Sequence, residues 1–391
     1  MPWKEETIMT QKYGFIEEVL KHQRSFSAIC EAYNISRQTG YKIMRAFKAG
    51  GYDALEAQSR APHRQARQTP AEIELKVLTI RTKHPTWGGR KIRAYLIRNG
   101  LAVASTPHPS TITDILRRHD LIDKEASLKR QKLSRFEHPE PNSLWQMDFK
   151  GRFKMLNKSR CFPLTITDDH SRFSLCVQAC ANEKRETVLS YFLRVCETNG
   201  MPKQVNVDNG NPWGNSSLYP HTQFTVTLMK LGIKVTHSRP KHPQTNGKCE
   251  RLHRTLKEDV ILRHHIRNMA HAQSLFDEWR ETYNYERPHE ALQMAVPADR
   301  YQKSPIILPD KVPELEYEAG ALLRKVRGNG GFSYNNQEYL IGKAFKNEYV
   351  EIKTDEERKV AKVYFGRHMV YRFDLQARSQ NGVILPESMI D

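Results

Sequence analysis

The feature that most constrains the fold is a change of hydrophobic period near residue 143. Before it, apolar residues recur at helical spacing; after it come three strand-like stretches, at 144–153, 161–169 and 172–180. Helices and strands then alternate, with helices predicted over 183–198, 222–231, 244–267 and 271–285 and strands over 204–207 and 233–237. A hairpin sheet followed by such alternation predicts an α/β domain.

Changes of composition divide the rest of the chain. Two segments with helical spacing precede the α/β domain, and each is followed by a segment rich in Lys and Arg. Short strand-like stretches separated by Gly and Asn turns fill the C-terminal part. We therefore predict a multidomain α/β protein with a helix-turn-helix module at 10–57, a basic linker at 58–69, a second helix-turn-helix module at 70–123, a basic linker at 124–141, a central α/β core at 142–305 and a small β-barrel at 316–376.

The net charge indicates a polyanionic partner. The 391 residues include 62 Lys and Arg against 44 Asp and Glu, a formal charge of +18, and nucleic acid is the commonest polyanion. A basic surface kept only for solubility is the alternative.

No run of 18 apolar residues and no signal-peptide core occur, so we expect no membrane partner. Six cysteines without a CxxC pair indicate reduced thiols in the cytoplasm.

Two short helices joined by a tight turn are predicted in the first module. Ser25 or Ser27 can cap the first helix, and Ser36 can cap the second. In helix-turn-helix domains the second helix lies in the major groove, whereas an ordinary helical hairpin is the alternative. The basic, amide-rich and hydroxyl-rich second helix favours DNA binding. Its expected DNA contacts are Arg37, Gln38, Thr39, Lys42 and Arg45.

The second module and the linkers add further candidate DNA contacts. Ser110 or Thr111 is expected to cap the third helix of this module, which looks like another winged or simple helix-turn-helix. The linkers hold many cations and few acids, as expected of segments that track phosphates. The candidates are Arg60, Arg64, Arg67, Arg90, Lys91, Lys129, Arg130 and Lys132.

One aspartate lies within a predicted strand and another lies at the end of one. Alternation places Trp145 and Met147 on one face of a strand and Asp148 on the other, so Asp148 projects from a strand built for burial. An unpaired Asp there is costly unless it binds a partner or a metal. Asp208 ends another strand, and because Asp-Asn-Gly is a good turn, a turn residue is the alternative for it.

A predicted helix carries the third acid. Glu250, His253, Arg254 and Lys257 fall at i, i+3, i+4 and i+7 and share one face of the helix. Taken alone, this face fits a solvated row of ion pairs. Taken with the two aspartates, it places an acid that completes a metal site beside cations that hold phosphates, so all three cationic residues are candidate DNA contacts.

Motifs around these acids resemble those of the integrase-core (DDE) transposases of bacterial insertion sequences, relatives of retroviral integrases. The matches are WQMDF around Asp148, VDNG around Asp208, HPQTNGKCER around Glu250, Trp87-Gly88-Gly89-Arg90-Lys91, and YNYERPHEAL at 283–292. They occur in the family's order over about residues 10–305, which makes the resemblance specific.

The resemblance implies a ribonuclease H-like catalytic core in which Asp148, Asp208 and Glu250 are the catalytic residues and metal ligands. Three carboxylates without His or Cys select Mg²⁺ or Mn²⁺, and two ions per active site can bridge one phosphate. The implied reaction frees 3′-OH ends of a mobile element and joins them to target DNA. The implied partners are double-stranded DNA and further copies of the chain, as a homodimer or larger assembly in the bacterial nucleoid.

Some features depart from the family pattern. The interval between Asp208 and Glu250 is longer than is common, and the Pro- and Gly-rich stretch 211–221 accounts for the surplus. Three alternatives remain: a helix-turn-helix regulator with a silent core, a ribonuclease H-like nuclease, and a structural chromatin protein. Loss of any of the three acids would favour the regulator, and none is lost.

Overall fold

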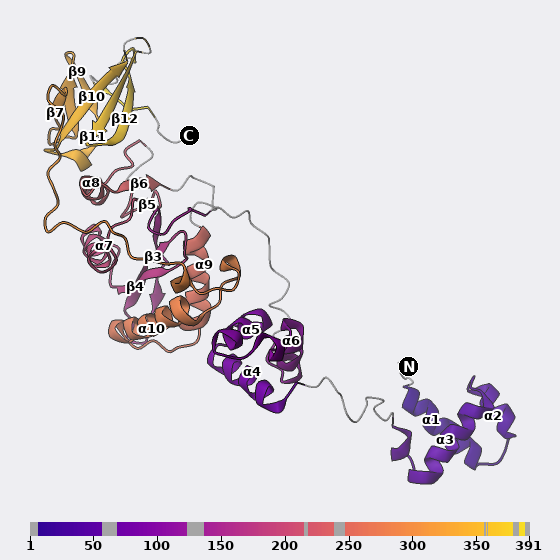
Figure 1. The fold of residues 1–391 in the computed structure, drawn as a ribbon. Coiled ribbons are helices and arrows are strands. Elements are labelled where there is room, and N and C mark those ends of the chain that lie inside the picture. The colour runs from indigo at the N-terminus through magenta and orange to yellow at the C-terminus, as the bar shows by residue number, and fades with distance from the viewer. Residues whose placement is uncertain are drawn as a thin grey trace. The chain divides into compact units, whose positions relative to one another are not determined.

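The computed structural model describes residues 7–56, 69–122, 137–214, 218–237, 247–355, 357, 359–377 and 383–387 (Figure 1). The chain divides into two compact units, Met1–Gln68 and Thr69–Asp391. In the described residues no helix is long and apolar enough to cross a membrane.

The first unit is a bundle of three helices. These are α1 (Ile8–Leu20), α2 (Phe26–Ala32) and α3 (Arg37–Gly50), followed by the 3₁₀ turn η1 (Asp53–Leu55). The Ser25 hydroxyl accepts a hydrogen bond from Ala28 N (3.3 Å) and the Ser36 hydroxyl accepts one from Thr39 N (3.2 Å), so serines cap α2 and α3 as predicted. Gly40 lies where α3 crosses α2, and a Cβ there would stand 2.7 Å from the Cys30 sulfur. The predicted helix pair and its tight turn are present.

The second unit begins with another small helical module. It contains α4 (Ala71–Lys83), α5 (Gly89–Arg98), the 3₁₀ turn η2 (Val103–Ser105) and α6 (Pro109–Arg118) around a core that includes Val77, Trp87, Ile92 and Ile112. A Cβ on Gly89 would stand 2.3 Å from the Pro109 carbonyl oxygen, so glycine lets α5 and α6 approach closely. The residue that caps α6 is His108, whose Nδ1 accepts from Ser110 N (3.4 Å). The prediction of Ser110 or Thr111 as the cap is therefore wrong.

A mixed sheet forms the centre of the second unit. Its strands are β1 (Trp145–Phe149), β2 (Phe153–Lys154), β3 (Arg160–Asp168), β4 (Ser174–Cys180), β5 (Gln204–Val207) and β6 (Lys234–His237). The order is β2-β3-β1-β5-β6, with β4 also paired to β3. The pairs of β3 with β1, β2 and β4 are antiparallel, whereas β1-β5 and β5-β6 are parallel. The predicted hairpin sheet and the alternation of helices and strands after it are present, although the first predicted strand divides into β1 and β2.

Helices cover both faces of this sheet. The core on one face joins α7 (Arg185–Asn199) and α8 (Gln223–Lys230) to the inward side chains of β1, β3 and β5. The core on the other face joins α9 (Gly247–Leu256) and α10 (Met269–Glu281) to β3 and β4. A π-helical turn follows each of these two helices, at Lys257–Ile261 and Thr282–Glu286, so the α-helix predicted over 244–267 ends earlier than expected. Short 3₁₀ turns, η7 (Glu290–Leu292) and η8 (Pro297–Asp299), complete the core.

The C-terminal part consists of two small sheets around one aromatic core. One sheet has the order β12-β11-β10-β7 and the other β13-β9-β8. Their strands are β7 (Leu323–Lys325), β8 (Gly331–Tyr334), β9 (Gln337–Leu340), β10 (Tyr349–Asp355), β11 (Val360–Phe365), β12 (His368–Asp374) and β13 (Val383–Ile384), with the 3₁₀ turn η9 (Lys343–Phe345). Both sheets contribute to the core, as Phe332 and Phe373 do. The predicted β region is present, but its described strands form two sheets and no closed barrel.

Candidate active site

The two predicted aspartates lie on neighbouring parallel strands. In the β1-β5 pair Trp145 faces Val205 and Gln146 faces Asn206, and continuing this register places Asp148 opposite Asp208. The ends of two adjacent strands therefore deliver two carboxylates to one edge of the sheet. Such an edge is where α/β folds collect functional side chains.

The electrostatic environment of Asp148 includes the charge of Glu250, the third predicted acid. The pKa of Asp148 is raised to about 7, first by burial, and a backbone hydrogen bond from Phe149 opposes that shift. The negative charges of Asp208, Glu250 and Glu183 raise the pKa further. These carboxylates thus repel one another in the absence of a cation.

Helix α9 presents Glu250 on its exposed side. Cys249, Leu252 and Leu256 of this helix are buried against the sheet. Glu250, Arg254 and Lys257 are exposed, which agrees with the predicted division into an apolar and a charged face, although Lys257 lies in the π turn beyond α9.

His253 differs from the other members of that predicted face. Its side chain is only 12% exposed, its Nε2 lies 2.7 Å from the Thr165 hydroxyl, and its Nδ1 lies 4.0 Å from Asp148 Oδ2. The Thr165 hydroxyl in turn donates to the Asp148 carbonyl oxygen (3.0 Å), so His253 Nε2 donates to Thr165. Burial, and then the charge of Lys150, lower the pKa of His253 to about 3. His253 is therefore neutral and braces the backbone of the strand that carries Asp148.

The donor chemistry of the three carboxylates fits a divalent cation, although their spacing is not that of a formed metal site. Among the residues that the structure describes, no three His, Cys, Asp or Glu side chains lie close enough together to hold a metal ion. The three candidates offer only oxygen donors, the ligands that Mg²⁺ and Mn²⁺ prefer. A divalent cation would also relieve the repulsion that raises the pKa of Asp148.

A tryptophan that the sequence did not single out supports the two aspartates. Trp213 is 2% exposed and its ring lies 5.7 Å from that of Phe149, the neighbour of Asp148. Its carbonyl oxygen accepts a hydrogen bond from the Thr222 hydroxyl at the start of α8 (3.2 Å). Since Trp213 follows Asp208 closely in the chain, it anchors the loop after Asp208 to the core. A large aromatic residue in a Pro- and Gly-rich stretch was the available signal.

The candidate DNA contacts of the first unit are all exposed. Arg37, Gln38, Thr39, Lys42 and Arg45 are exposed on α3. Among the described residues, none of the three cations in this group forms an ion pair with an acid. Arg60, Arg64, Arg67, Lys129, Arg130 and Lys132, the linker candidates, lie outside the described residues.

Arg90 and Lys91 have a different environment. Arg90 pairs with Glu290 (3.9 Å). The pKa of Lys91 is lowered to about 7, first by burial and then by the charges of Arg287 and Arg251. The predicted motif that holds Arg90 and Lys91 therefore faces the ERPHE segment of the core, which lies far along the sequence from it.

Further polar contacts join the same two parts of the second unit. Thr86 Oγ1 donates to Asp259 Oδ1 (2.7 Å), and Asp259 Oδ2 accepts from Trp279 Nε1 (3.0 Å). Arg98 donates to both carboxylate oxygens of Asp299, at 2.7 and 2.9 Å. The helical module of residues 69–122 thus contacts the α/β core through hydrogen bonds and an ion pair.

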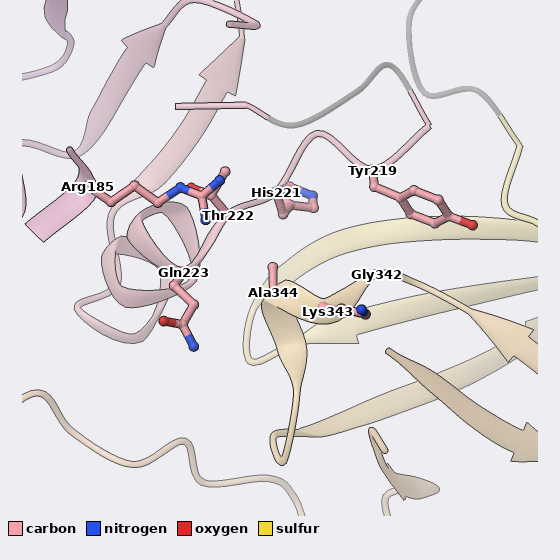
Figure 2. Close-up of a pocket in the computed structure, with 8 residues that line it drawn as sticks. All are labelled: Arg185, Tyr219, His221, Thr222, Gln223, Gly342, Lys343 and Ala344. Carbon is pink, nitrogen blue, oxygen red and sulfur yellow. The ribbon is translucent and has the colours of Figure 1, made fainter. Parts of the chain in front are cut away.

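A cavity of about 200 Å³ lies between the core and the C-terminal sheets (Figure 2). Arg185 at the start of α7 and Lys343 of η9 contribute cations to its lining, together with His221. Burial and the nearby His237 lower the pKa of His221 to about 3, so this ring is neutral. None of the three carboxylates lines the cavity, which is therefore separate from the candidate active site.

Family models match most of the chain. They are a helix-turn-helix domain at residues 11–63, a homeodomain-like domain at 39–116, integrase core domains at 138–243 and 231–297, and the C-terminal domain of IS481 family transposases at 322–381. The three predicted carboxylates fall within the two integrase core matches.

Curated relatives come from insertion elements and retroviruses. An uncharacterized protein of insertion element IS407 from Burkholderia multivorans is 24% identical over 41% of this chain and 55% of its own length. The transposase of insertion sequence IS904 from Lactococcus lactis is 26% identical over 45% of this chain and 68% of its own. The Gag-Pro-Pol polyprotein of squirrel monkey retrovirus is 33% identical over 30% of this chain and 6% of its own. The chain spans about half the length of the first of these relatives.

Solved structures show a weaker likeness. The HTLV-2 integrase catalytic core domain in complex with magnesium is 18% identical over 41% of this chain and 97% of its own, with a TM-score of 0.33. A simian T-cell lymphotropic virus intasome is 15% identical over 73% of this chain and 91% of its own, with a TM-score of 0.38.

Proposed function

From the premise that the chain belongs to the integrase-core transposases of insertion sequences, relatives of retroviral integrases, we propose that it is a DDE-type DNA transposase. The observation that supports the proposal is the register that sets Asp148 opposite Asp208 on adjacent strands, with Glu250 of α9 near enough for its charge to raise the pKa of Asp148. Paired or grouped carboxylates at the edge of a sheet are suited to hold the cations of phosphoryl transfer.

The reaction consists of two in-line displacements at phosphorus. Water attacks the phosphodiester at the end of the element and the DNA 3′ oxygen leaves, which frees a 3′-OH. That 3′-OH then attacks a phosphodiester of the target DNA and displaces its 3′ oxygen. Two Mg²⁺ or Mn²⁺ ions held by the three carboxylates would stabilise the charge on the phosphate and on the leaving oxygen.

The chain's own residues position the reactants. Arg254 and Lys257 project from the same side of the helical segment as Glu250 and would bind phosphates next to the reacting one. His253 is too buried to contact DNA as placed, and it holds Asp148 in position through Thr165. The exposed face of α3 would bind the ends of the element through the major groove.

We further propose that double-stranded DNA, as element ends and as target, is the partner, and that a homodimer or larger assembly forms on it. Two ends must be held together for both to be joined to one target, which requires at least two copies of the site. The work would take place on the bacterial nucleoid in the cytoplasm. Sedimentation of the protein with and without DNA carrying an element end tests the assembly, and a single copy bound per pair of ends would contradict it.

The activity is tested with purified protein, labelled DNA that carries an element end, and Mg²⁺. Wild-type protein is expected to nick at the 3′ end and to transfer that end to a second DNA. Asp208→Ala is expected to lower both rates by about 1,000-fold or more, because it removes a metal ligand. Asp310→Asn, at an exposed acid remote in sequence from the site, is the control. Equal activity of wild type and Asp208→Ala would refute the proposal.

A further inference from the structure

We propose that Lys248, Asp169 and Gln146 are positioning residues, which hold the first turn of α9 against β1 and so place Glu250 beside Asp148. None of the three touches the reacting atoms in this proposal. The inference rests on the proposed function for the meaning of the site, but the contacts that carry it stand independently.

Asp169 is the centre of the network. It lies in the turn between β3 and β4 and is 1% exposed. Its Oδ2 accepts from His138 N (2.9 Å) and its Oδ1 accepts from Gln146 Nε2 (2.9 Å). Lys248 forms an ion pair with its carboxylate and also donates to its carbonyl oxygen (3.1 Å). A buried carboxylate with this many donors is fully satisfied and rigidly held.

Gln146 connects this centre to both catalytic elements. It lies on β1 one alternation before Asp148, is 3% exposed, and projects from the same face of the strand as Asp148. While its amide nitrogen donates to Asp169, its Oε1 accepts a hydrogen bond from Cys249 N (3.4 Å). One side chain therefore joins the strand of Asp148 to the residue that precedes Glu250.

The side chain of Glu250 is exposed, so its position is set by the contacts of the residues next to it on α9. In the first described turn of α9, Cys249 N donates to Gln146 Oε1 and so ties the turn to β1. Lys248 ties the same turn to Asp169 from the other side. Groups that hold a metal ligand in place typically alter metal affinity or activity by about 10- to 100-fold when removed.

The main experiment compares Lys248→Met with Lys203→Met. Both substitutions remove the ammonium from an ion pair, but the pair of Lys203 with Glu140 is exposed and remote from α9. Three measurements are made on the full chain: Mn²⁺ affinity without DNA, the Mg²⁺ concentration that half-saturates 3′ nicking, and amide hydrogen exchange of residues 247–256 without metal. Asp169→Asn and the conservative Lys248→Arg complete the set, with thermal unfolding as the measure of folding.

We expect Lys248→Met and Asp169→Asn to weaken Mn²⁺ binding and raise the half-saturating Mg²⁺ concentration by about 10-fold or more. We also expect faster exchange in 247–256 for both, partial recovery with Lys248→Arg, and wild-type behaviour for Lys203→Met. Unchanged Mn²⁺ affinity in folded Lys248→Met would overturn the inference, even with altered stability or exchange. If Asp169→Asn does not fold, Lys248→Met and Lys248→Arg decide.

The outcomes separate this inference from the proposed function. Wild-type protein that binds Mn²⁺ but neither nicks nor joins DNA contradicts the proposed function, and the effect of Lys248→Met on Mn²⁺ affinity still decides the inference. Wild-type protein that nicks DNA with Mg²⁺ while Lys248→Met keeps the same half-saturating concentration supports the function and overturns the inference.

Discussion

The two helical modules at the N-terminal side have similar internal construction, and their cations differ in the partners they have. Each packs three helices around its own apolar core, with a glycine at a close helix crossing, Gly40 in the first and Gly89 in the second. The first turns the cations of α3 to solvent. The second turns Arg90 and Arg98 toward acids of the catalytic core.

This difference shows that a basic helix does not by itself identify a DNA-binding surface. An exposed cation without an acidic neighbour attracts phosphate, whereas a carboxylate of the same protein beside a cation offsets part of its charge. Arg37 and Arg90 looked equally suited to DNA in the sequence, and their partners distinguish them. We therefore expect the cations of α3 to be more accessible to phosphate than Arg90 and Arg98, which face acids of the core.

The largest expected effect is on DNA affinity, and it tests whether the cations of α3 bind DNA. Replacing Arg37, Lys42 and Arg45 together by Ala should lower affinity for DNA carrying an element end by about 100-fold, since base and phosphate contacts are worth roughly 1–3 kcal/mol each and are partly redundant. The slope of log affinity against log salt should fall by about 3. Fluorescence anisotropy over a salt series measures both.

The comparison in the second module is the single variant Arg90→Ala, which should leave DNA affinity within about 2-fold if Arg90 faces Glu290 and not DNA. Equal losses for the two variants would remove the distinction between the modules. The thermal midpoint of the triple variant should not move, because all three side chains are exposed.

The next largest effect concerns the dock between the second module and the core. Asp259 accepts hydrogen bonds from Thr86 and Trp279, so Asp259→Asn replaces one acceptor by a donor. We expect a loss of about 2 kcal/mol of stability, or roughly 4–8 °C in the thermal midpoint. Glu258→Gln, at the exposed neighbouring position, should shift the midpoint by less than about 1 °C. Equal shifts for the two variants would show that Asp259 does not hold the dock.

Features set by local sequence were predictable. Strand alternation around Asp148, the turn after Asp208 and the capping of α3 by Ser36 all depend on residues within a few positions of one another. The resemblance to integrase-core transposases is confirmed by the family matches. It was recognisable in the sequence because its motifs are short, ordered and specific.

Features set by distant partners were not predictable. The hydrogen bond between His253 and Thr165 joins residues 88 positions apart, and helical spacing alone placed His253 on the charged face. The acid that pairs with Arg90 is Glu290, which belongs to another part of the second unit, so the sequence offered only the charge of Arg90. The extent of the C-terminal sheets also depends on pairing across the fold, as β13 with β9 illustrates.

Replacing Lys91 is expected to change stability by less than replacing Asp259 does, and in the opposite direction. Folding lowers its pKa to about 7, first through burial and then through Arg287 and Arg251, while Asp259 and Glu290 oppose the shift. The unfolded chain therefore binds the extra proton, and this group makes stability rise with pH between about 7 and 10.5. Lys91→Met should stabilise the second unit by on the order of 1 kcal/mol near pH 7, after allowance for solvent screening, and by less at pH 10. Thermal midpoints at both pH values measure this; a destabilised variant at pH 7 would show that the ammonium is held favourably.

The smallest expected effect is on stability. It tests whether the exposed pair of Arg98 and Asp299 contributes less than the contacts of Asp259. Arg98 binds Asp299 through two hydrogen bonds and lowers the pKa of that carboxylate, but both side chains are more than one third exposed. Arg98→Met should therefore cost only about 0.5 kcal/mol at pH 7 and low salt, and the cost should vanish near 1 M salt. Since the pKa of Asp299 is depressed on folding, the contribution is present above its usual value of 3.8 and is lost as the pH falls through the lower folded value. Urea denaturation of Arg98→Met and wild type at pH 7 and pH 3, with and without salt, measures the difference. A cost as large as that of Asp259→Asn, and unchanged by salt, would place Arg98 with Asp259 among the residues that hold the dock together.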